Sequence, residues 1–237
     1  MLINLRNALM AGKKWKNPYV TGGLVAMWDG EWNAAGGKHN DTATAIKDLV
    51  GSCDLSIVDT TTIGVNYFLP ASIQNVVNLL SSVPLPTTIR AIEMTVTDAS
   101  GGINNFGIMT IAQSYRGVCK FSQWIGCGSR GNYLMRQQSV NSGIVVWSIN
   151  YNNDNNNTDV SFCKNGEAVS GASIHWSNVA MNDGTDGDKL VRVRAPYADC
   201  RIYSIRLYSR ALTAAEIAAN YAIDKARVGV PERKDTP

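Results

Sequence analysis

The chain has 237 residues, of which 45% are hydrophobic, so it can bury a sizeable core as a single domain. Its formal charge of +3 and its isoelectric point near 8.6 are mild, and the basic residues are scattered except for Lys13, Lys14 and Lys16, which argues against a nucleic-acid-binding surface. The sequence contains no apolar run of about eighteen residues, so we expect no membrane-spanning helix.

The first nineteen residues are predicted to form an N-terminal arm, residues 1–19, that is separate from the rest of the chain. Its apolar residues fall near one face of a helix: Leu2, Leu5, Leu9 and Met10. Such a stripe needs a partner surface, so we expect an assembly element that contacts other protein subunits. Polar residues interrupt the apolar run and the positive charges follow it, which does not fit a secretory signal peptide.

Short alternating segments predict a series of β-strands after the arm. The first strand is expected at residues 24–28, and the polar residues 29–45 are expected to form a loop. Further short strands are expected near Ile57 and within residues 61–69. Residues 71–83 have apolar side chains at helical spacing but also two asparagines, so a short helix and a strand remain alternatives there.

A longer strand is predicted over residues 89–97, with Ile92, Met94 and Val96 on a buried face and Glu93 on a face toward solvent. Later segments with strand character are separated by glycine-containing or asparagine-rich turns: 106–112, 118–125, 133–137, 145–151, 160–162, 174–179 and 190–193. Asn165 and Gly166 predict a two-residue hairpin turn, because both residues tolerate positive φ.

The closing strand is predicted over residues 201–208. Alternate residues share a face, with Tyr203, Ile205 and Leu207 on one side. The other side carries four residues: Ile202, Ser204, Arg206 and Tyr208.

A helix is predicted to follow this strand. Thr213 and Glu216 have the spacing of a capping box, and Leu212 with Ile217 has the spacing of a hydrophobic staple. The helix is expected to end before Gly229.

Three runs of residues carry a family resemblance: IRLYSRALTAAEIAANYAIDKARVG (205–229), GLVAMWDGEWNAAGG (23–37) and IKDLVG (46–51). They resemble LamG-like members of the concanavalin A-like lectin/glucanase superfamily, in the form common in bacterial surface proteins and bacteriophage proteins. The resemblance implies an all-β jelly-roll β-sandwich over residues 20–229 with a short C-terminal helix, preceded by the arm and followed by a polar tail, 230–237. Members of the family bind glycans, hydrolyse glycans or act as structural and adhesive modules, so the fold does not choose among these functions.

Two groups of residues are candidates for glycan binding, because sugar recognition pairs an aromatic platform with amide and carboxylate side chains. The residues are Trp28, Asp29, Glu31, Trp32 and Asn33 in one group, and Trp176 and Asn178 in the other. Tryptophan in a β-sandwich is more often a core residue than a platform. Trp32 lies in a polar loop and is the tryptophan most expected to be exposed.

Calcium is the cofactor that the resemblance implies, and it prefers clustered oxygen ligands. Asp183, Asp186 and Asp188 are crowded into one loop and are the candidate metal ligands, although they do not form a complete EF-hand motif and also fit a solvated turn.

Catalytic motifs are incomplete. Hydrolytic relatives carry E-x-D-x-x-E on one strand, because retaining glycosidases need two carboxylates about 5 Å apart. This chain has Glu93, Thr95 and Asp98 at those positions, so the middle carboxylate is missing. The run GCGSRG at 126–131 matches G-x-G-x-x-G, but the residues after it favour a strand and not the helix that a dinucleotide site requires.

Five cysteines occur in the chain: Cys53, Cys119, Cys127, Cys163 and Cys200. Their number is odd and no two form a C-x-x-C pair, so buried free thiols are expected.

Together these patterns and the resemblance favour a non-catalytic glycan-binding or adhesive module. We expect it to be part of a larger assembly, such as a phage virion or a cell surface, that it joins after cytoplasmic synthesis. A purely structural subunit that makes protein contacts is the alternative, and a glycoside hydrolase has the least support.

Overall fold

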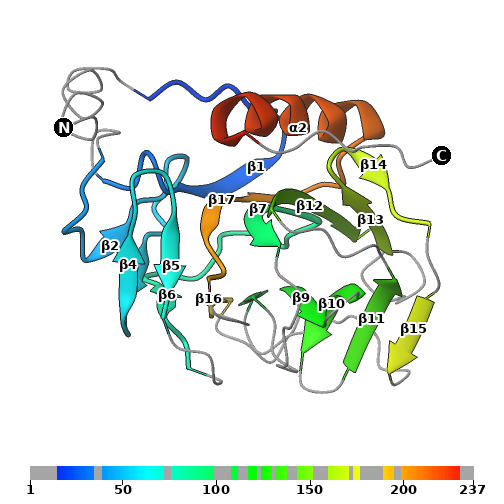
Figure 1. Cartoon of the computed structure of the whole chain (residues 1–237), viewed down its shortest axis with the longest axis horizontal. Helices are drawn as coiled ribbons and strands as arrows, with labels where there is room; N and C mark the ends of the chain where they lie inside the picture. The colour runs from blue at the N-terminus through cyan, green and yellow to red at the C-terminus, as the bar shows by residue number, and fades with distance from the viewer. Residues whose placement is uncertain are drawn as a thin grey trace.

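The structure, a computed structural model, describes the following residues: 15–34, 39–71, 76–98, 108–111, 117–121, 124–129, 132–137, 143–151, 160–170, 173–176, 189–194 and 199–229. They form two stacked antiparallel sheets, with one helix on the outer face of one sheet (Figure 1). The expected fold class, an all-β sandwich closed by a short C-terminal helix, is therefore confirmed. No helix in these residues is long and apolar enough to cross a bilayer.

The sheet under the helix has eight strands. In order they are β14 (Glu167–Ala168), β13 (Val160–Lys164), β12 (Gly143–Tyr151), β7 (Ala91–Asp98), β17 (Ile202–Tyr208), β5 (Phe68–Pro70) and β4 (Thr61–Ile63), with β1 (Leu24–Asp29) also paired to β17. Because β7 occupies one side of β17, β1 and β5 share the other side. Ile202 of β17 pairs with β5, whereas Ser204 to Tyr208 pair with β1, so β1 and β5 meet end to end.

The second sheet has nine strands. In order they are β15 (Ser173–Trp176), β11 (Asn132–Gln137), β10 (Trp124–Ser129), β9 (Gly117–Phe121), β8 (Met109–Ile111), β16 (Val191–Val193), β6 (Leu79–Ser81), β3 (Leu55–Ile57) and β2 (Ala45–Ile46). Within the ambiguous segment 71–83, the strand alternative is therefore the one observed at β6. Gly126 and Gly128 of the GCGSRG run lie within β10, and the residues after the run form β11, the strand that was expected there in place of a helix. Gly131 lies outside the described residues.

The main core lies between the two sheets and is built from alternate strand residues. Ile92, Met94 and Val96 of β7 point into it, as predicted, together with the fully buried Trp28 and Trp147. None of the four cysteines whose side chains the structure describes forms a disulfide: Cys53, Cys127 and Cys200 are buried and Cys163 is half-buried.

One part of the predicted alternation in β17 is wrong. Ile202 was expected on the opposite face from Ile205 and Leu207, but all three belong to the main core. The pairing of β17 with β7 shifts register between Ile202 and Ser204. Such a bulge adds a residue to one strand and turns the residues before it to the other face.

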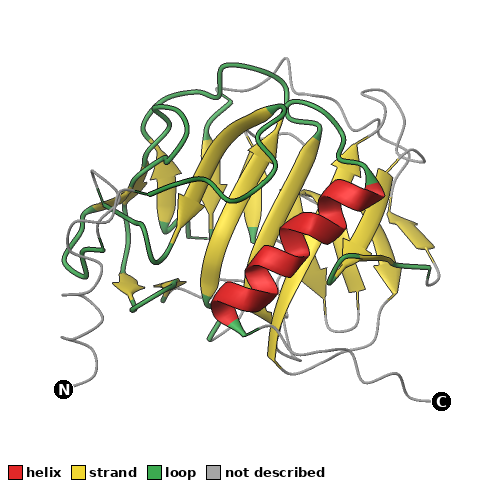
Figure 2. Cartoon of the chain, turned by 90° about the horizontal axis from the view of Figure 1, so that it is seen from above, coloured by secondary structure: helices red, strands yellow, loops and turns green. Residues whose placement is uncertain are grey.

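The helix α2 (Ala214–Val228) begins and ends as predicted. The Thr213 hydroxyl accepts from the Glu216 N–H at 3.3 Å, and the Glu216 carboxylate accepts from the Thr213 N–H at 2.9 Å, which completes the capping box. Leu212 and Ile217 are both buried, and Gly229 closes the helix in the left-handed region at φ 70°. Figure 2 shows α2 lying diagonally across the strands of the eight-stranded sheet.

The hairpin between β13 and β14 confirms the predicted two-residue turn. Asn165 and Gly166 have φ values of 52° and 82°, and Lys164 pairs with Glu167 across the turn. Positive φ at both central residues is the backbone geometry that this pair of residue types tolerates best.

Candidate functional site

The loop after β1 carries the first group of predicted ligand-binding residues. Asp29, the last residue of β1, turns the chain with one carboxylate oxygen: Oδ1 accepts from the N–H of Glu31 at 2.9 Å and of Trp32 at 3.3 Å. The side chains of Glu31 and Trp32 are half-buried and reach the surface, whereas Asp29 is only 1% exposed. Asp29 therefore supports the loop from within, whereas Glu31 and Trp32 keep part of their surface exposed.

Gly30 brings this loop against the end of β5. Its N–H donates to the Tyr203 carbonyl at 2.9 Å, and a Cβ added to Gly30 would lie 2.4 Å from the backbone nitrogen of Tyr67. A side chain at this position would overlap the neighbouring backbone, so only glycine fits. The close approach follows from the end-to-end meeting of β1 and β5 along β17.

Asn33 closes the loop by a reciprocal pair of hydrogen bonds with Asn40. The Asn33 Nδ2 donates to the Asn40 carbonyl at 2.7 Å, and the Asn40 N–H donates to the Asn33 Oδ1 at 2.9 Å. Asn33 is fully buried, so its amide is used inside the loop. The half-buried His39 adds a third contact, with its Nδ1 at 3.2 Å from the Gly30 carbonyl oxygen.

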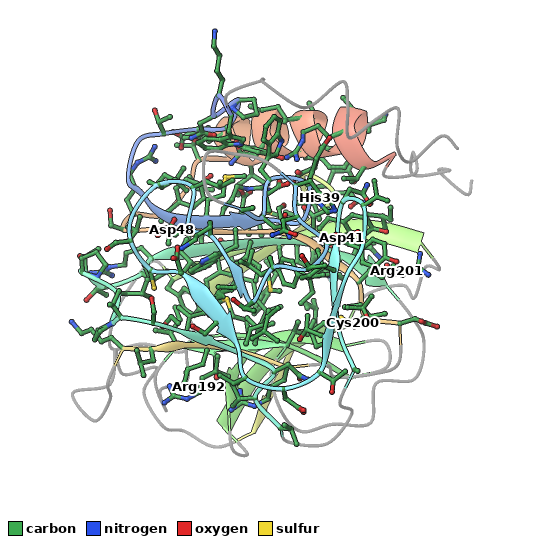
Figure 3. The ribbon with its side chains drawn as sticks, turned by 90° about the vertical axis from the view of Figure 1, so that its left-hand side faces the viewer. His39, Asp41, Asp48, Arg192, Cys200 and Arg201 are labelled. Atoms are coloured by element: carbon green, nitrogen blue, oxygen red, sulfur yellow. The ribbon has the colours of Figure 1, made fainter. Side chains whose placement is uncertain are left out.

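Tyr67, Tyr203 and Arg201 form an aromatic and cationic surface beside Gly30. The two tyrosine rings meet edge to face, with centroids 6.0 Å apart and planes at 65°. The guanidinium of the exposed Arg201 lies 5.0 Å from the centre of the Tyr67 ring, within cation–π distance. Figure 3, which labels Arg201 and His39, looks onto the side of the molecule where both are found. The sequence patterns did not single out any of these residues.

A network of buried charges lies between α2 and the outer face of the eight-stranded sheet. Arg206 of β17 is at its centre, with its Nε 3.1 Å from the Glu93 Oε2 and its Nη2 2.5 Å from the Asp224 Oδ2. All three side chains are at most 1% exposed. A buried arginine with two carboxylate partners is well satisfied. Loss of Arg206 would leave two buried carboxylates without this counter-charge, and loss of either carboxylate would leave buried N–H groups of Arg206 without their charged acceptor.

The prediction that Glu93 faces solvent is wrong. Its carboxylate also accepts from the Ser148 hydroxyl at 2.8 Å and from the Asn220 amide at 2.7 Å. Burial raises the pKa of Glu93, against the opposing charge of Arg206, which lowers it. The alternation of β7 was read correctly, but α2 covers the face that was expected to meet water.

Tyr19 brings the segment before β1 into this network. Its hydroxyl donates to the Asp224 Oδ1 at 2.6 Å and accepts from Arg227, and its ring lies 4.1 Å from the guanidinium carbon of Arg206. Burial raises the pKa of the Tyr19 hydroxyl. Tyr19 therefore packs on the sandwich, although it falls at the end of the predicted arm; residues 1–14 lie outside the described structure.

Arg227, in the last turn of α2, connects the network to the loop. Its Nη2 donates to the Asp29 Oδ2 at 2.8 Å and lies 3.4 Å from the Glu31 Oε2. Burial raises the pKa of Asp29, while the positive charge of Arg227 acts to lower it. The two oxygens of Asp29 thus have different partners: Oδ1 holds the loop and Oδ2 holds the helix.

The sequence did contain a signal for the network. Asn220 and Asp224 follow Ile217 by three and seven positions, so they share the buried face of α2. Polar residues alternate on the facing strands, as at Glu93 and Arg206. A polar helix face that matches polar strand faces indicates a buried hydrogen-bonded layer, but the pattern does not say which helix and strands meet.

Some predicted site residues cannot be placed beside the loop. Trp176 ends β15, and Asn178, Asp183, Asp186 and Asp188 lie outside the described residues. In the part of the chain that is described, no group of three or more His, Cys, Asp or Glu side chains is arranged to hold a metal ion. Calcium binding by the three aspartates stays a prediction.

No family model and no curated protein matches the sequence. Among solved structures, the fold is similar to Trypanosoma rangeli sialidase in complex with sialic acid, with a TM-score of 0.59, 12% identity, and coverage of 95% of this chain and 37% of that chain. It is also similar to the binding domain of botulinum neurotoxin DC in complex with rat synaptotagmin II, with a TM-score of 0.57, 10% identity, and coverage of 85% and 51%.

The binding domain of botulinum neurotoxin serotype D gives a TM-score of 0.53 at 13% identity, with coverage of 86% of this chain and 53% of that chain. The chain thus spans between 37% and 53% of the length of these three proteins. At such identities the likeness shows the fold alone. It supports the β-sandwich fold.

Proposed function

We propose that this chain is a non-catalytic glycan-binding module and that the loop carrying Glu31 and Trp32 is its binding site. The observation that carries the proposal is this loop, in which Glu31 and Trp32 both stay partly exposed while Asp29 and Asn33 brace the backbone from within. An indole and a carboxylate on one loop match a pyranose, which has an apolar face and a polar rim. A braced loop also loses little conformational freedom on binding.

The surface around Gly30, two residues before Trp32, supports the same ligand class. Tyr67 adds a second aromatic side chain, Arg201 adds hydrogen-bond donors, and His39 adds an imidazole ring held at the Gly30 carbonyl. Aromatic rings flanked by a few polar groups are the usual composition of small-ligand sites. The sialidase neighbour was solved with sialic acid, which is consistent with a sugar ligand for a domain of this kind.

The burial of Glu93 supports the non-catalytic part of the proposal. In hydrolytic relatives the corresponding carboxylate would have to reach a scissile bond beside a second carboxylate. Here Glu93 is fully buried and engaged by Arg206, Asn220 and Ser148. Measurement of reducing ends released from β-glucans tests this point, and a release that Glu93→Gln abolishes while the protein stays folded would restore the enzyme alternative.

The wider setting of the module remains part of the proposal. The LamG-like resemblance favours a component of a larger surface assembly such as a phage virion, with the N-terminal arm making contacts to other subunits. A purely structural subunit that contacts only proteins is the second candidate. It is favoured by the neurotoxin neighbour, which was solved with a protein partner, rat synaptotagmin II.

A glycan array built from bacterial surface polysaccharides tests the proposed function. We expect a signal from the native chain and its loss in Trp32→Ala. Tyr221→Ala is the matched control. Tyr221 is also a half-buried aromatic residue, but it lies on α2 and packs against Gly166 of the β13–β14 turn. An equal loss in both variants would indicate a general effect on folding, and a native chain that gives no signal would leave the structural candidate.

A further inference from the structure

We infer that Arg227 is a positioning residue for the proposed binding site: it acts through Asp29 to hold the backbone of Glu31 and Trp32 in the conformation that presents their side chains. The consequence for ligand binding rests on the proposed function, whereas the effect on the loop does not. Arg227 lies 198 positions from Asp29 in the sequence, yet it becomes part of the proposed site through this contact.

Asp29 can hold the loop only while its carboxylate is ionised and correctly oriented. Its Oδ1 accepts two backbone N–H groups, and its Oδ2 accepts from Arg227 at 2.8 Å. The side chain is 1% exposed, so water cannot replace a lost partner. Without Arg227, the buried carboxylate would lose the positive charge that stabilises its ionised form. A protonated or rotated carboxyl group would accept the two N–H groups less well.

Arg227 is itself held in place. Its Nη1 donates to the Tyr19 hydroxyl, and its guanidinium carbon lies 5.7 Å from the centre of the Tyr19 ring. Tyr19 in turn donates to Asp224 on α2 at 2.6 Å. The guanidinium is therefore fixed relative to both the helix and the sheet, and it transmits that position to Asp29.

Besides Asp29, Arg227 also reaches the Glu31 Oε2, at 3.4 Å, whereas the two contacts that flank this segment do not involve it. Gly30 is bonded to Tyr203, and Asn33 is bonded to Asn40. These contacts anchor the loop on either side of Glu31 and Trp32. Loss of Arg227 is therefore expected to loosen a short segment and not to detach the whole loop.

Arg227→Met tests the inference, with Arg210→Met as a matched control. Arg210 also belongs to an arginine–carboxylate pair that involves α2, with its Nη2 2.5 Å from the Glu216 Oε1, but that pair lies at the start of the helix. Among the described residues, neither member of the pair forms a hydrogen bond or ion pair with residues 29–34. Amide hydrogen exchange, resolved by NMR, is the readout that does not need a ligand. We expect the Glu31 and Trp32 amides to exchange about tenfold faster or more in Arg227→Met, because a hydrogen bond to a charged group contributes roughly 1.5–3 kcal/mol.

Affinity for the array polysaccharide that the native chain binds most strongly is the second readout. We expect a loss of about tenfold in Arg227→Met and none in Arg210→Met, since a displaced contact residue forfeits its interactions. Arg227→Lys keeps the charge but cannot bridge Tyr19 and Asp29 in the same plane, so its exchange rates and affinity should lie between those of the native chain and Arg227→Met. This variant replaces Arg227→Met in the test if Arg227→Met does not fold. Exchange rates at Glu31 and Trp32 equal to those of Arg210→Met would overturn the inference. Faster exchange in a protein that binds no polysaccharide would instead retain the inference about the loop and reject the proposed function.

Discussion

Arg206 donates to both carboxylate oxygens of Asp224, from Nη1 to Oδ1 at 3.1 Å and from Nη2 to Oδ2 at 2.5 Å. This two-point contact joins the closing strand to the closing helix. Both side chains are almost completely removed from solvent, so the pair is an internal connection between sheet and helix and not a surface ion pair. If either Arg206 or Asp224 is replaced, the remaining side chain stays buried and water cannot take the place of the lost partner.

Asp224→Asn should therefore destabilise the domain strongly. We expect the free energy of unfolding to fall by about 3 kcal/mol, because Arg206 keeps Glu93 as its counter-charge but loses the carboxylate that accepts two of its N–H groups. Urea denaturation checks this value. Arg210→Met, which removes a half-exposed ion pair, should cost at most about 1 kcal/mol. Similar losses in the two variants would mean that the buried position of the network gives it no special weight.

Thr213→Ala should lower the free energy of unfolding by about 1 kcal/mol, because a lost N-cap leaves a helix-end N–H without its acceptor. The Thr213 hydroxyl is that acceptor for the Glu216 N–H. Thr213→Ser keeps the hydroxyl and should be close to native. An unchanged midpoint in chemical denaturation of Thr213→Ala would contradict this role for the cap.

Glu216 predicts a defined pH dependence. Hydrogen bonds from Arg210 and from the Thr213 N–H lower its pKa from 4.5 to about 2. A lowered pKa means that the ionised form favours the folded state, so the contribution is present above pH 4.5 and is lost as the pH falls toward 2. The difference in urea midpoint between the native chain and Glu216→Gln should therefore be constant at neutral pH and shrink through this acid range. A difference that grows on acidification would have the wrong sign.

Calcium should raise the melting temperature if Asp183, Asp186 and Asp188 form a site, because a ligand that binds only the folded state stabilises it. Differential scanning fluorimetry with calcium and then with excess chelator measures the shift and its reversal. The triple substitution to asparagine is expected to remove the shift. No shift at millimolar calcium in the native chain would remove calcium from the list of cofactors.

The N-terminal arm can be tested by two truncations. A chain that begins at Trp15 should keep its melting temperature and lose association in light scattering, since it lacks the apolar stripe of residues 2–10. A chain that begins at Thr21 also lacks Tyr19 and should be less stable by about 2 kcal/mol, the scale of hydrogen bonds to charged groups. A native chain that is monomeric would remove the assembly role of the arm.

Local features were predictable because their interactions span few residues. The Thr213–Glu216 capping box, the Asn165–Gly166 turn and the inward face of β7 all appear as expected. Each depends on hydrogen bonds or side-chain directions set within about four residues, so the residue types alone indicate the geometry. The sandwich class followed from many such segments and from the resemblance at the two ends of the chain.

The candidate site depends on tertiary contacts that local sequence patterns do not indicate. The sequence indicated Asp29, Glu31, Trp32 and Asn33 as one group, but it could not show that Asp29 and Asn33 turn inward while the other two keep part of their surface exposed. That division depends on Asn40 and on Arg227, whose partners are selected by loop closure and by the docking of α2.

The sequence by itself determined where α2 begins and ends and where the Asn165–Gly166 turn lies, because these features depend on hydrogen bonds and backbone angles of near neighbours. It indicated the strands only approximately: the single strand expected at 118–125, for example, falls within two strands, β9 and β10. Only the tertiary structure decided that Glu93 is buried and that Arg227 meets Asp29, which lies 198 positions earlier. Strand order and helix docking create these contacts, and an alternating pattern marks two faces of a strand without saying what covers each of them. The environment of a charged side chain is therefore set by the element that packs against it, which no local pattern contains.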